Sequence, residues 1–411
     1  MTTMAIDNKD KKVLNVPHLR FPEFSEEWEI CKVSELLDFY STNSLSWEQL
    51  EYGTKAMMNL HYGLIHVGLP TMVDLTRDNL PNIKEDNMPK NFELCKEGDV
   101  AFADASEDTN EVAKPIEFFD LAGKNIVCGL HTIHGRDNKN KTVIGFKGYA
   151  FSSSAFHNQI RRIAQGTKIY SISTKNFSEC FIGIPSKVEQ TKIATLLRLI
   201  DERIATQNKI IEDLKKLKSA IIDQLYSAIK GKGYSYRQIF EIVNERNKQL
   251  EYSNILSASQ EKGMVNREDL NLDIQFERSN INTYKVVRKG DYVIHLRSFQ
   301  GGYAFSDKIG VCSPAYTILR PNDLLEFRYL SYYFTSQKFI KSLIIVTYGI
   351  RDGRSINVEE WLDMKTTIPQ KEQQRHIVDT IRNIEKKIEN EELYASYLSK
   401  QKQYLLRQLF I

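Results

Sequence analysis

Two segments decide the fold of this 411-residue chain: IPSKVEQTKIATLL at 184–197 and IPQKEQQRHIVDTI at 368–381. They lie 184 residues apart, and thirteen of the 43 positions that align between 184–226 and 368–410 are identical. Self-similarity at one fixed separation indicates that the same structural plan occurs twice in the chain.

Behind each repeated segment, apolar residues recur at alternating steps of four and three, which is typical of a coiled-coil seam. Polar residues interrupt the seam at matching places in both copies, first at Gln207 and Glu391 and then at Lys218 and Lys402. We therefore expect two long helices that pair as an antiparallel coiled coil. The residues expected to pair are Ile193, Leu197, Ile200, Ile204, Leu214, Leu225, Ile377, Ile381, Ile384, Ile388, Leu398 and Leu409.

The segments before the two helices also correspond, for example at Gly98-Asp99 and Gly290-Asp291. Between such anchors, short β-branched or aromatic runs are separated by Gly, Asp and Asn, which predicts an α+β fold with two tandem mixed domains. The expected boundaries are a tail at 1–16, a first domain at 17–184, a helix at 185–232, a second domain at 233–368 and a helix at 369–411.

Composition narrows the class of protein. The chain has 56 Lys+Arg against 53 Asp+Glu and 41% apolar residues, as expected of a folded protein of two or three domains. No apolar run is long enough to cross a membrane, and the first residues lack the apolar region of a signal peptide. Five scattered cysteines indicate reduced thiols rather than a disulfide framework, so we expect a cytoplasmic location.

The charge is unevenly distributed within the first domain. Residues 17–183 carry 17 basic and 23 acidic groups, yet 121–178 carry nine basic groups against one acid, Asp137. Such a strip can face a polyanion. It can equally be a solvated face whose acidic neighbour, 93–120, supplies the opposite sign. Charge alone leaves both interpretations open.

Two loops at equivalent places in the two copies carry the groups that contact phosphates and base edges in DNA, namely Arg, Lys, Gln, hydroxyls and an aromatic ring. They span 161–170 and 347–355, and a third candidate spans 297–300. The alternative is that Arg351 and Arg354 pair with Asp352 and Glu359 at the surface. The candidate DNA-binding residues are Arg161, Arg162, Gln165, Thr167, Lys168, Tyr170, Arg297, Ser298, Gln300, Tyr348, Arg351, Arg354 and Ser355.

Catalytic and metal motifs are weak. Gly231-Lys232 lacks the upstream glycine of a phosphate-binding loop. Cys128, His131 and His134 have no obvious fourth ligand, and a strand there would turn the two histidines to opposite faces, so we expect no metal site. Asp363 and Lys365 resemble half of a nuclease motif, but the upstream acid is missing. We expect no catalytic residues in this chain.

The opening VPHLRFPEF at 16–24, closing on Trp28, resembles the start of the specificity subunit of type I restriction–modification systems. The two Ile-Pro-x-Lys-x-x-Gln-x-x-Ile segments at 184–193 and 368–377 resemble the same family, and the resemblance covers the whole chain. The family's recognition residues vary, so they do not transfer position by position.

The resemblance implies two target-recognition domains, each reading one half of a bipartite site in double-stranded DNA through the major groove. It implies that the paired helices set the spacer and dock two modification subunits, which carry the S-adenosylmethionine site. A restriction subunit would supply the ATP- and Mg-dependent translocase and nuclease. This chain itself would bind neither cofactor and would not contact a membrane.

Two alternatives from other classes remain. A non-catalytic coiled-coil adaptor with two unlike protein-binding modules fits the duplicated helices equally well, and salt-dependent duplex binding would distinguish it. A nuclease acting alone, through Asp363 and Lys365, would show metal-dependent cleavage by the purified chain.

Overall fold

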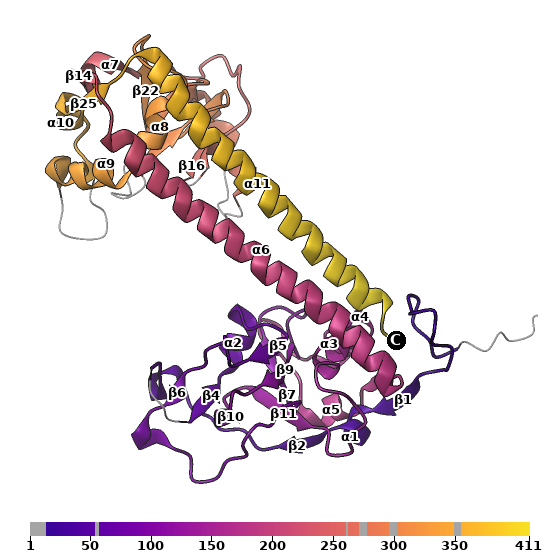
Figure 1. Cartoon of the computed structure of the whole chain (residues 1–411). Helices are drawn as coiled ribbons and strands as arrows, with labels where there is room; N and C mark the ends of the chain where they lie inside the picture. Colours follow the sequence, from indigo (N-terminus) through magenta and orange to yellow (C-terminus); the bar gives the residue numbers. More distant parts are fainter. Residues whose placement is uncertain (1–13, 54–56, 260–261, 271–277, 296–301, 349–354) are drawn as a thin grey trace, which may run out of the picture. The chain divides into compact units, whose positions relative to one another are not determined.

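The structure is a computed structural model of the chain, and it describes residues 14–53, 57–259, 262–270, 278–295, 302–348 and 355–411 (Figure 1). Contacts divide the chain into two units: unit 1 comprises Met1–Asn208 and Leu393–Ile411, and unit 2 comprises Lys209–Glu392. This division differs from the expected domains, because each long helix is shared between the units rather than forming a segment of its own.

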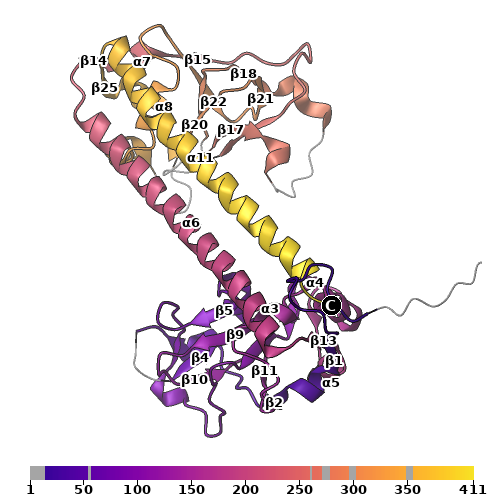
Figure 2. The ribbon, with the colours of Figure 1, turned by 45° about the vertical axis from the view of Figure 1, so that its right-hand side comes forward.

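Unit 1 is built on two sheets (Figure 2). The larger has the order β2 (Asp38–Tyr40), β11 (Thr132–Arg136), β7 (Val100–Ala103), β9 (Pro115–Asp120) and β5 (Met72–Asp74). The smaller has the order β10 (Ile126–Cys128), β4 (Met58–Leu60), β6 (Asn82–Ile83) and β3 (Leu50–Glu51). Pairing is antiparallel except between β5 and β9 and between β10 and β4, so the sheets are mixed.

Alternation along β7 divides unit 1 into two cores, because successive side chains of a strand point to opposite faces. Val100 and Phe102 belong to a core that includes the first turns of the long helix after this domain. Ala101 and Ala103 belong to a second core, shared with residues of β4 and β10 of the smaller sheet. The helices of the domain are α1 (Val33–Leu36), α2 (Tyr62–Val67), α3 (Lys147–Phe151), α4 (Ser154–Ile163) and α5 (Thr174–Ser178).

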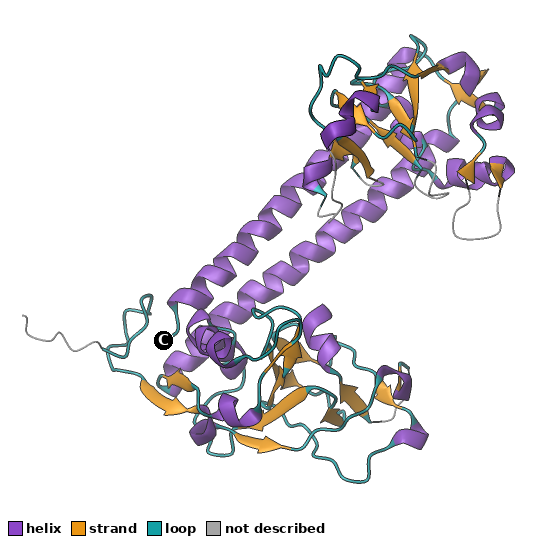
Figure 3. Ribbon diagram, turned by 180° about the vertical axis from the view of Figure 1, so that it is seen from behind, coloured by secondary structure: helices purple, strands orange, loops and turns teal. Residues whose placement is uncertain are grey.

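Unit 2 is likewise built of strands and short helices (Figure 3). Its main sheet has the order β15 (Phe240–Val243), β22 (Thr317–Pro321), β19 (Tyr292–Ile294) and β20 (Tyr303–Phe305). Two-stranded pairs are β16 (Leu256–Ser259) with β17 (Gly263–Asn266) and β18 (Lys285–Val287) with β21 (Gly310–Cys312). The helices are α7 (Tyr236–Ile239), α8 (Tyr329–Tyr333), α9 (Gln337–Ser342) and α10 (Val358–Asp363). Its core is aromatic, with Tyr236 stacked on Trp361 at 4.2 Å between ring centroids.

The two long helices are α6 (Lys187–Ser227) and α11 (Lys371–Gln408). In unit 1, Asp201 of α6 pairs with Lys402 at 2.6 Å, and Arg203 donates to the Tyr394 hydroxyl at 2.7 Å. In unit 2, Lys215 pairs with Glu392 at 2.7 Å and Lys218 with Glu385 at 3.4 Å. Within each unit the partner's number falls as the α6 number rises, which confirms that the helices are antiparallel.

The predicted pairing residues have two roles. Ile193, Leu197 and Ile200 are buried in the core of unit 1, together with Leu405 near the end of α11 and Leu409 just after it. Ile377 and Ile381 are buried in the core of unit 2. The apolar spacing therefore serves packing on the neighbouring domain as well as packing between helices. Of the rest, Ile388 and Leu398 are buried, and Ile204, Leu214, Leu225 and Ile384 are half-buried.

Two buried polar interactions are found in both units. The Gln190 side chain accepts from the Val143 amide and donates to the carbonyls of Lys141 and Pro185. Gln374, 184 residues later, makes the same three bonds to Glu326, Leu324 and Pro369. Both glutamines are fully buried, so each fixes the angle at which its long helix leaves a domain.

The buried aspartates repeat in the same way. Arg136 forms a bidentate pair with Asp99, and Arg320 forms one with Asp291. Each domain is also closed by one antiparallel strand pair, which joins the start of the domain to its last strand: β1 (Glu29–Lys32) with β13 (Phe181–Ile184), and β14 (Lys232–Ser235) with β25 (Lys365–Ile368).

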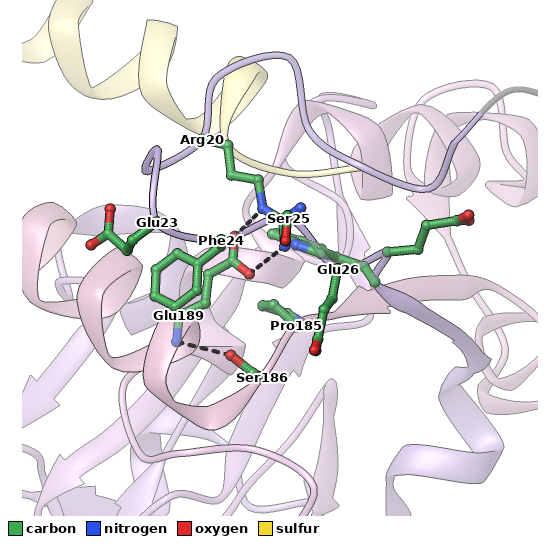
Figure 4. Close-up of a pocket in the computed structure, with 10 residues that line it drawn as sticks. Arg20, Glu23, Phe24, Ser25, Glu26, Pro185, Ser186 and Glu189 are labelled. Carbon is green, nitrogen blue, oxygen red and sulfur yellow. Dashed lines mark hydrogen bonds and ion pairs between the residues drawn. The ribbon is translucent and has the colours of Figure 1, made fainter.

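The opening segment fastens unit 1 to both long helices. Arg20 forms a bidentate ion pair with the buried Glu189 in the first turn of α6, at 2.7 and 2.8 Å (Figure 4). The Leu19 amide donates to the carbonyl of Gln408, the last residue of α11. A pocket of about 210 Å³ lies between this segment and Pro185-Ser186. The opening motif, which carries the family resemblance, therefore contacts the first turn of α6 and the last residue of α11.

None of the helices in the described part of the chain combines the length and the apolar character that a membrane span requires.

Candidate nucleic-acid interface

The loop nominated in unit 1 is the tip of a tight hairpin. The backbones of Gln165 and Ser171 exchange two hydrogen bonds, at 2.9 and 2.8 Å. Gly166 has φ +139°, and a Cβ there would lie 1.8 Å from the carbonyl oxygen of Ile169, so only glycine fits. The turn leaves the side chains of Gln165, Thr167 and Lys168 exposed, and Tyr170 half-buried.

Helix α4 presents the two arginines beside this hairpin. Its N-cap Ser153 accepts from the Phe156 amide, and Phe156 and Ile160 form the buried face. Arg161 and Arg162 fall on the exposed face of the last turn, where cations are favoured by the helix dipole. Arg161 donates to the Asn110 side chain at 3.0 Å, which places it against the turn that follows β8 (Ala105–Ser106).

Strand β8 connects the hairpin to a second group of side chains. It pairs with β12 (Tyr170–Ser171) on one side, and its Ala105 carbonyl lies 2.9 Å from His66 Nε2 of α2 on the other. Next along the chain, the Asp104 carboxylate lies 3.1 Å from the exposed His131 ring. The hairpin, β8 and α2 are therefore linked by direct contacts within unit 1.

Beside α2 lies a row of aromatic rings that the sequence analysis missed. Trp47 lies 4.5 Å from His61, His61 lies 4.8 Å from Tyr62, and Tyr62 lies 5.2 Å from His131, between ring centroids. Trp47 is 45% exposed. Burial, aided by His131, lowers the pKa of His61, so that ring is neutral near pH 7. No spacing signal could have found this group, because its members come from three separate segments.

Acidic groups lie beside the histidines of this region. Asp104 is engaged by His131, and Glu111 pairs with Lys114 at 2.7 Å and lies 3.8 Å from His66. Lys114 offsets part of this negative charge, whereas the hairpin tip, 165–170, and the end of α4 contain only basic and neutral residues.

In unit 2 the equivalent hairpin is formed by β23 (Thr347–Tyr348) and β24 (Ser355–Ile356), whose register pairs Tyr348 with Ser355. The side chains of these two residues are not described. Arg351 and Arg354, and likewise Arg297, Ser298 and Gln300, lie outside the described residues. Glu359, a suggested partner for the arginines, pairs with Arg237 at 3.0 Å.

The whole chain was compared with known proteins. No protein-family model matches it. It is 22% identical, over 408 residues, to a Methanocaldococcus jannaschii protein that carries the name type I restriction enzyme MjaX specificity subunit; the match covers 94% of this chain and 93% of that one. It superposes on the crystal structure of the type I restriction–modification system S subunit from M. genitalium with a TM-score of 0.51, at 16% identity, over 96% of this chain and 99% of that one.

A structure that describes the assembly and conformational transition of the type I restriction–modification system matches with a TM-score of 0.59, at 15% identity, over 92% of this chain and 96% of that one. Both structural matches thus extend along nearly all of each chain. The chain has the fold of type I specificity subunits. The predicted α+β architecture, with two long helices behind two domains, is confirmed.

In this specificity-subunit fold, the basic strip at 121–178 is not one face. Arg136 is held by Asp99 and Glu93, and Lys147 is buried 3.1 Å from Glu117. Lys141 pairs with Glu29, and Lys139 donates to the Glu35 carbonyl. Charge counted along the sequence does not distinguish cations that are held by ion pairs and hydrogen bonds from cations that are exposed to solvent. The cations exposed at the hairpin and nearby are Arg161, Arg162, Lys168 and Lys175.

Asp363, the acidic residue of the incomplete nuclease motif, is held in an ion pair. Asp363 ends α10 and accepts from Arg237 at 2.9 Å, so its carboxylate already has a cationic partner. Among Cys128, His131 and His134, the histidines diverge as the strand interpretation predicts: His131 is exposed, whereas His134 is fully buried on β11. Cys95 takes the place of His131 beside Cys128 and His134.

Proposed function

We infer that this chain is the DNA-specificity subunit of a type I restriction–modification complex. The observation that carries the inference is a duplicated plan with unlike loop sequences: the same Asp–Arg pair, helix-entry glutamine and strand-paired loop in each unit, but different amino acids at 166–170 and 349–354. A shared frame with divergent tips suits two different half-sequences on one DNA.

Each unit reads one half of a bipartite duplex target. In unit 1, Gln165 and Thr167 offer hydrogen-bonding groups to base edges, and Arg161, Arg162 and Lys168 offer positive charge to phosphates. In unit 2, Tyr348, Arg351, Arg354 and Ser355 have the equivalent role, with Arg297, Ser298 and Gln300 as further candidates. Phosphate contacts supply most of the affinity, and base contacts contribute about 1–3 kcal/mol of discrimination each.

The long helices set the distance between the half-sites and dock two modification subunits. Large apolar side chains on α6 and α11 support the docking role: Leu199, Ile210, Leu217, Tyr397 and Tyr404 are each at least 40% exposed. An isolated surface residue of this kind is ordinary, but a series along two helices is typical of a protein interface.

The chain is a non-catalytic subunit. Methyl transfer from S-adenosylmethionine belongs to the modification subunits, and ATP- and Mg-dependent translocation and cleavage belong to a restriction subunit. In this assembly the specificity chain binds neither cofactor.

A selection experiment tests the function. The chain is purified together with its modification subunits, and a randomised duplex library is enriched by repeated binding. We expect the bound duplexes to share two short sequences at a constant separation, with binding that weakens steeply as salt rises. Binding without any enriched sequence, or no duplex binding at all, would contradict the proposal and favour a protein adaptor.

A further inference from the structure

A cluster of metal-ligating side chains lies in the interior of unit 1. Cys95, Cys128 and His134 each offer one ligand atom, and these atoms all lie within 4.8 Å of one another. The two sulfurs are 3.6 Å apart. The exposed fractions are 5%, 2% and 0%, so the cluster is closed to bulk solvent.

Backbone pairing brings the three residues together from distant parts of the chain. The Cys95 amide donates to the Ile126 carbonyl at 2.8 Å, which ties the segment before β7 to β10. Cys128 is the last residue of β10. His134 lies on β11, where its neighbour Ile133 belongs to the helix-side core and His134 therefore faces the core between the sheets.

The histidine ring is oriented as a metal ligand is. Its Nε2 lies 2.7 Å from the carboxylate of Asp99, while its Nδ1 is buried without a hydrogen-bond partner. Asp99 is fixed in turn by a bidentate pair with Arg136 and by the Lys96 amide. Metal-binding histidines usually donate their second ring N–H to such a carboxylate, which leaves the other nitrogen to the metal.

In unit 2 the equivalent positions do not hold such a set of three metal-ligating side chains. By the internal repeat, Cys128 corresponds to Cys312, Cys95 to Val287 and His134 to Ile318. Those three residues pack in one apolar cluster. The Asp291–Arg320 pair is still present there, so the aspartate and arginine do not account for the cysteine and histidine in unit 1.

An unpartnered imidazole nitrogen in a protein interior is costly, whereas Val and Ile at the same places would pack without cost. We propose that Cys95, Cys128 and Nδ1 of His134 bind one thiophilic metal ion, Zn²⁺, which fastens the segment before β7 to β10 and β11. The site is independent of the DNA-specificity role.

Geometry and charge both fit zinc. Zn–S bonds of about 2.3 Å at a tetrahedral centre put two sulfurs about 3.8 Å apart, close to the distance here. Two thiolates neutralise the divalent ion, and Asp99 and Arg136 neutralise each other, so no net charge is left in the interior. Three protein ligands leave the fourth position to a water molecule.

Metal analysis of the full-length chain, purified under reducing conditions and supplied with Zn²⁺, tests the proposal. We expect one tightly held zinc per chain, lost in the double variant Cys95→Ser/Cys128→Ser and kept in Cys312→Ser, the matched control. Asp99→Asn is expected to weaken zinc affinity roughly 10–100-fold while leaving the ligands in place.

A measurement on the unaltered chain guards against variants that fail to fold. Replacing Zn²⁺ by Co²⁺ should give sulfur-to-cobalt charge-transfer absorption with the intensity of two thiolates and the visible bands of a tetrahedral ion. Absence of those bands would overturn the proposal, as would equal zinc content in the double serine variant. Formation of a Cys95–Cys128 disulfide that Zn²⁺ does not prevent would overturn it as well.

Discussion

Asp291 lies immediately before β19 and accepts hydrogen bonds from Arg320, at 2.9 Å to each carboxylate oxygen, and from the Arg288 amide at 2.8 Å. Its counterpart Asp99 accepts from Arg136 and the Lys96 amide in the same pattern. Burial alone would raise the pKa of Asp99, but the bonds from His134 and Arg136 outweigh it and lower that pKa. A short Gly-Asp signal in the sequence thus marks a buried ion pair in each domain.

Replacing Asp291 with Ala leaves the Arg320 guanidinium without its partner and the Arg288 amide without an acceptor. We expect a loss of about 2–3 kcal/mol in the free energy of unfolding, measured by urea denaturation. Asp307→Ala is the control, because Asp307 is 45% exposed and pairs with Arg328 at the surface; its loss should be below about 1 kcal/mol. Equal losses in the two variants would show that the buried pair stabilises its domain no more than a surface ion pair does.

At the hairpin tip, Gln165→Ala separates base reading from phosphate binding. Its backbone bonds to Ser171 remain, so the hairpin should persist. We expect binding to the preferred duplex to weaken by about 1–3 kcal/mol, with relaxed preference at one base pair of one half-site.

Lys168→Ala should instead weaken binding to all duplexes alike and reduce the salt dependence by about one counterion. Lys386→Ala, an exposed change on α11, should alter neither property. Competition binding over a panel of single-base variants measures all three effects. Gln165 would be excluded from base reading if its variant weakened every duplex equally.

Single residues mark the limit of what could be predicted. Arg136 and Lys147 count as basic in the sequence but are buried against Asp99 and Glu117. Trp47 and His131 lie far apart in the chain, yet His61 and Tyr62 join them in one row of packed rings. Such arrangements depend on tertiary pairing, which charge counts and local spacing do not contain.

The long helices were the most predictable elements, because a four-three spacing over about 40 residues permits few other structures. The polar interruptions of the seam also proved informative. Two of the four polar seam residues form cross-helix ion pairs within their own units: Lys218 pairs with Glu385, and Lys402 pairs with Asp201. Opposite charges at these places favour one register of the helices over its neighbours.

Removing one heptad from both helices, 207–213 and 391–397, tests the proposed spacing role. Each helix shortens by about 10 Å, or about three base pairs of duplex, while the seam stays in phase. We expect both half-sequences to be retained and the spacer between them to shorten by about that amount, measured by methylation mapping.

The deletion in α6 alone is the control, since it puts the two helices out of register and should abolish recognition. A change in either half-sequence in the double deletion would show that the helices take part in reading bases rather than in spacing.

At the scale of the whole molecule, contacts join the start of each long helix and the end of the other to one domain. The repeat at 184 residues predicted two copies of a domain and helix, but not this exchange, because a repeat reports similarity and not contact. The Leu19 bond to Gln408 and the T-shaped contact of Trp28 with Phe410 bring the opening motif to the end of the chain.

The central claim is that one chain with two unlike units specifies a two-part DNA sequence. Its most direct test is genome-wide mapping of adenine methylation, by single-molecule sequencing, in cells that make the modification subunits with and without this gene. We predict one bipartite motif, two short sequences at a fixed separation, that is methylated only when the gene is present. An identical set of methylated motifs in both cell lines would contradict the account.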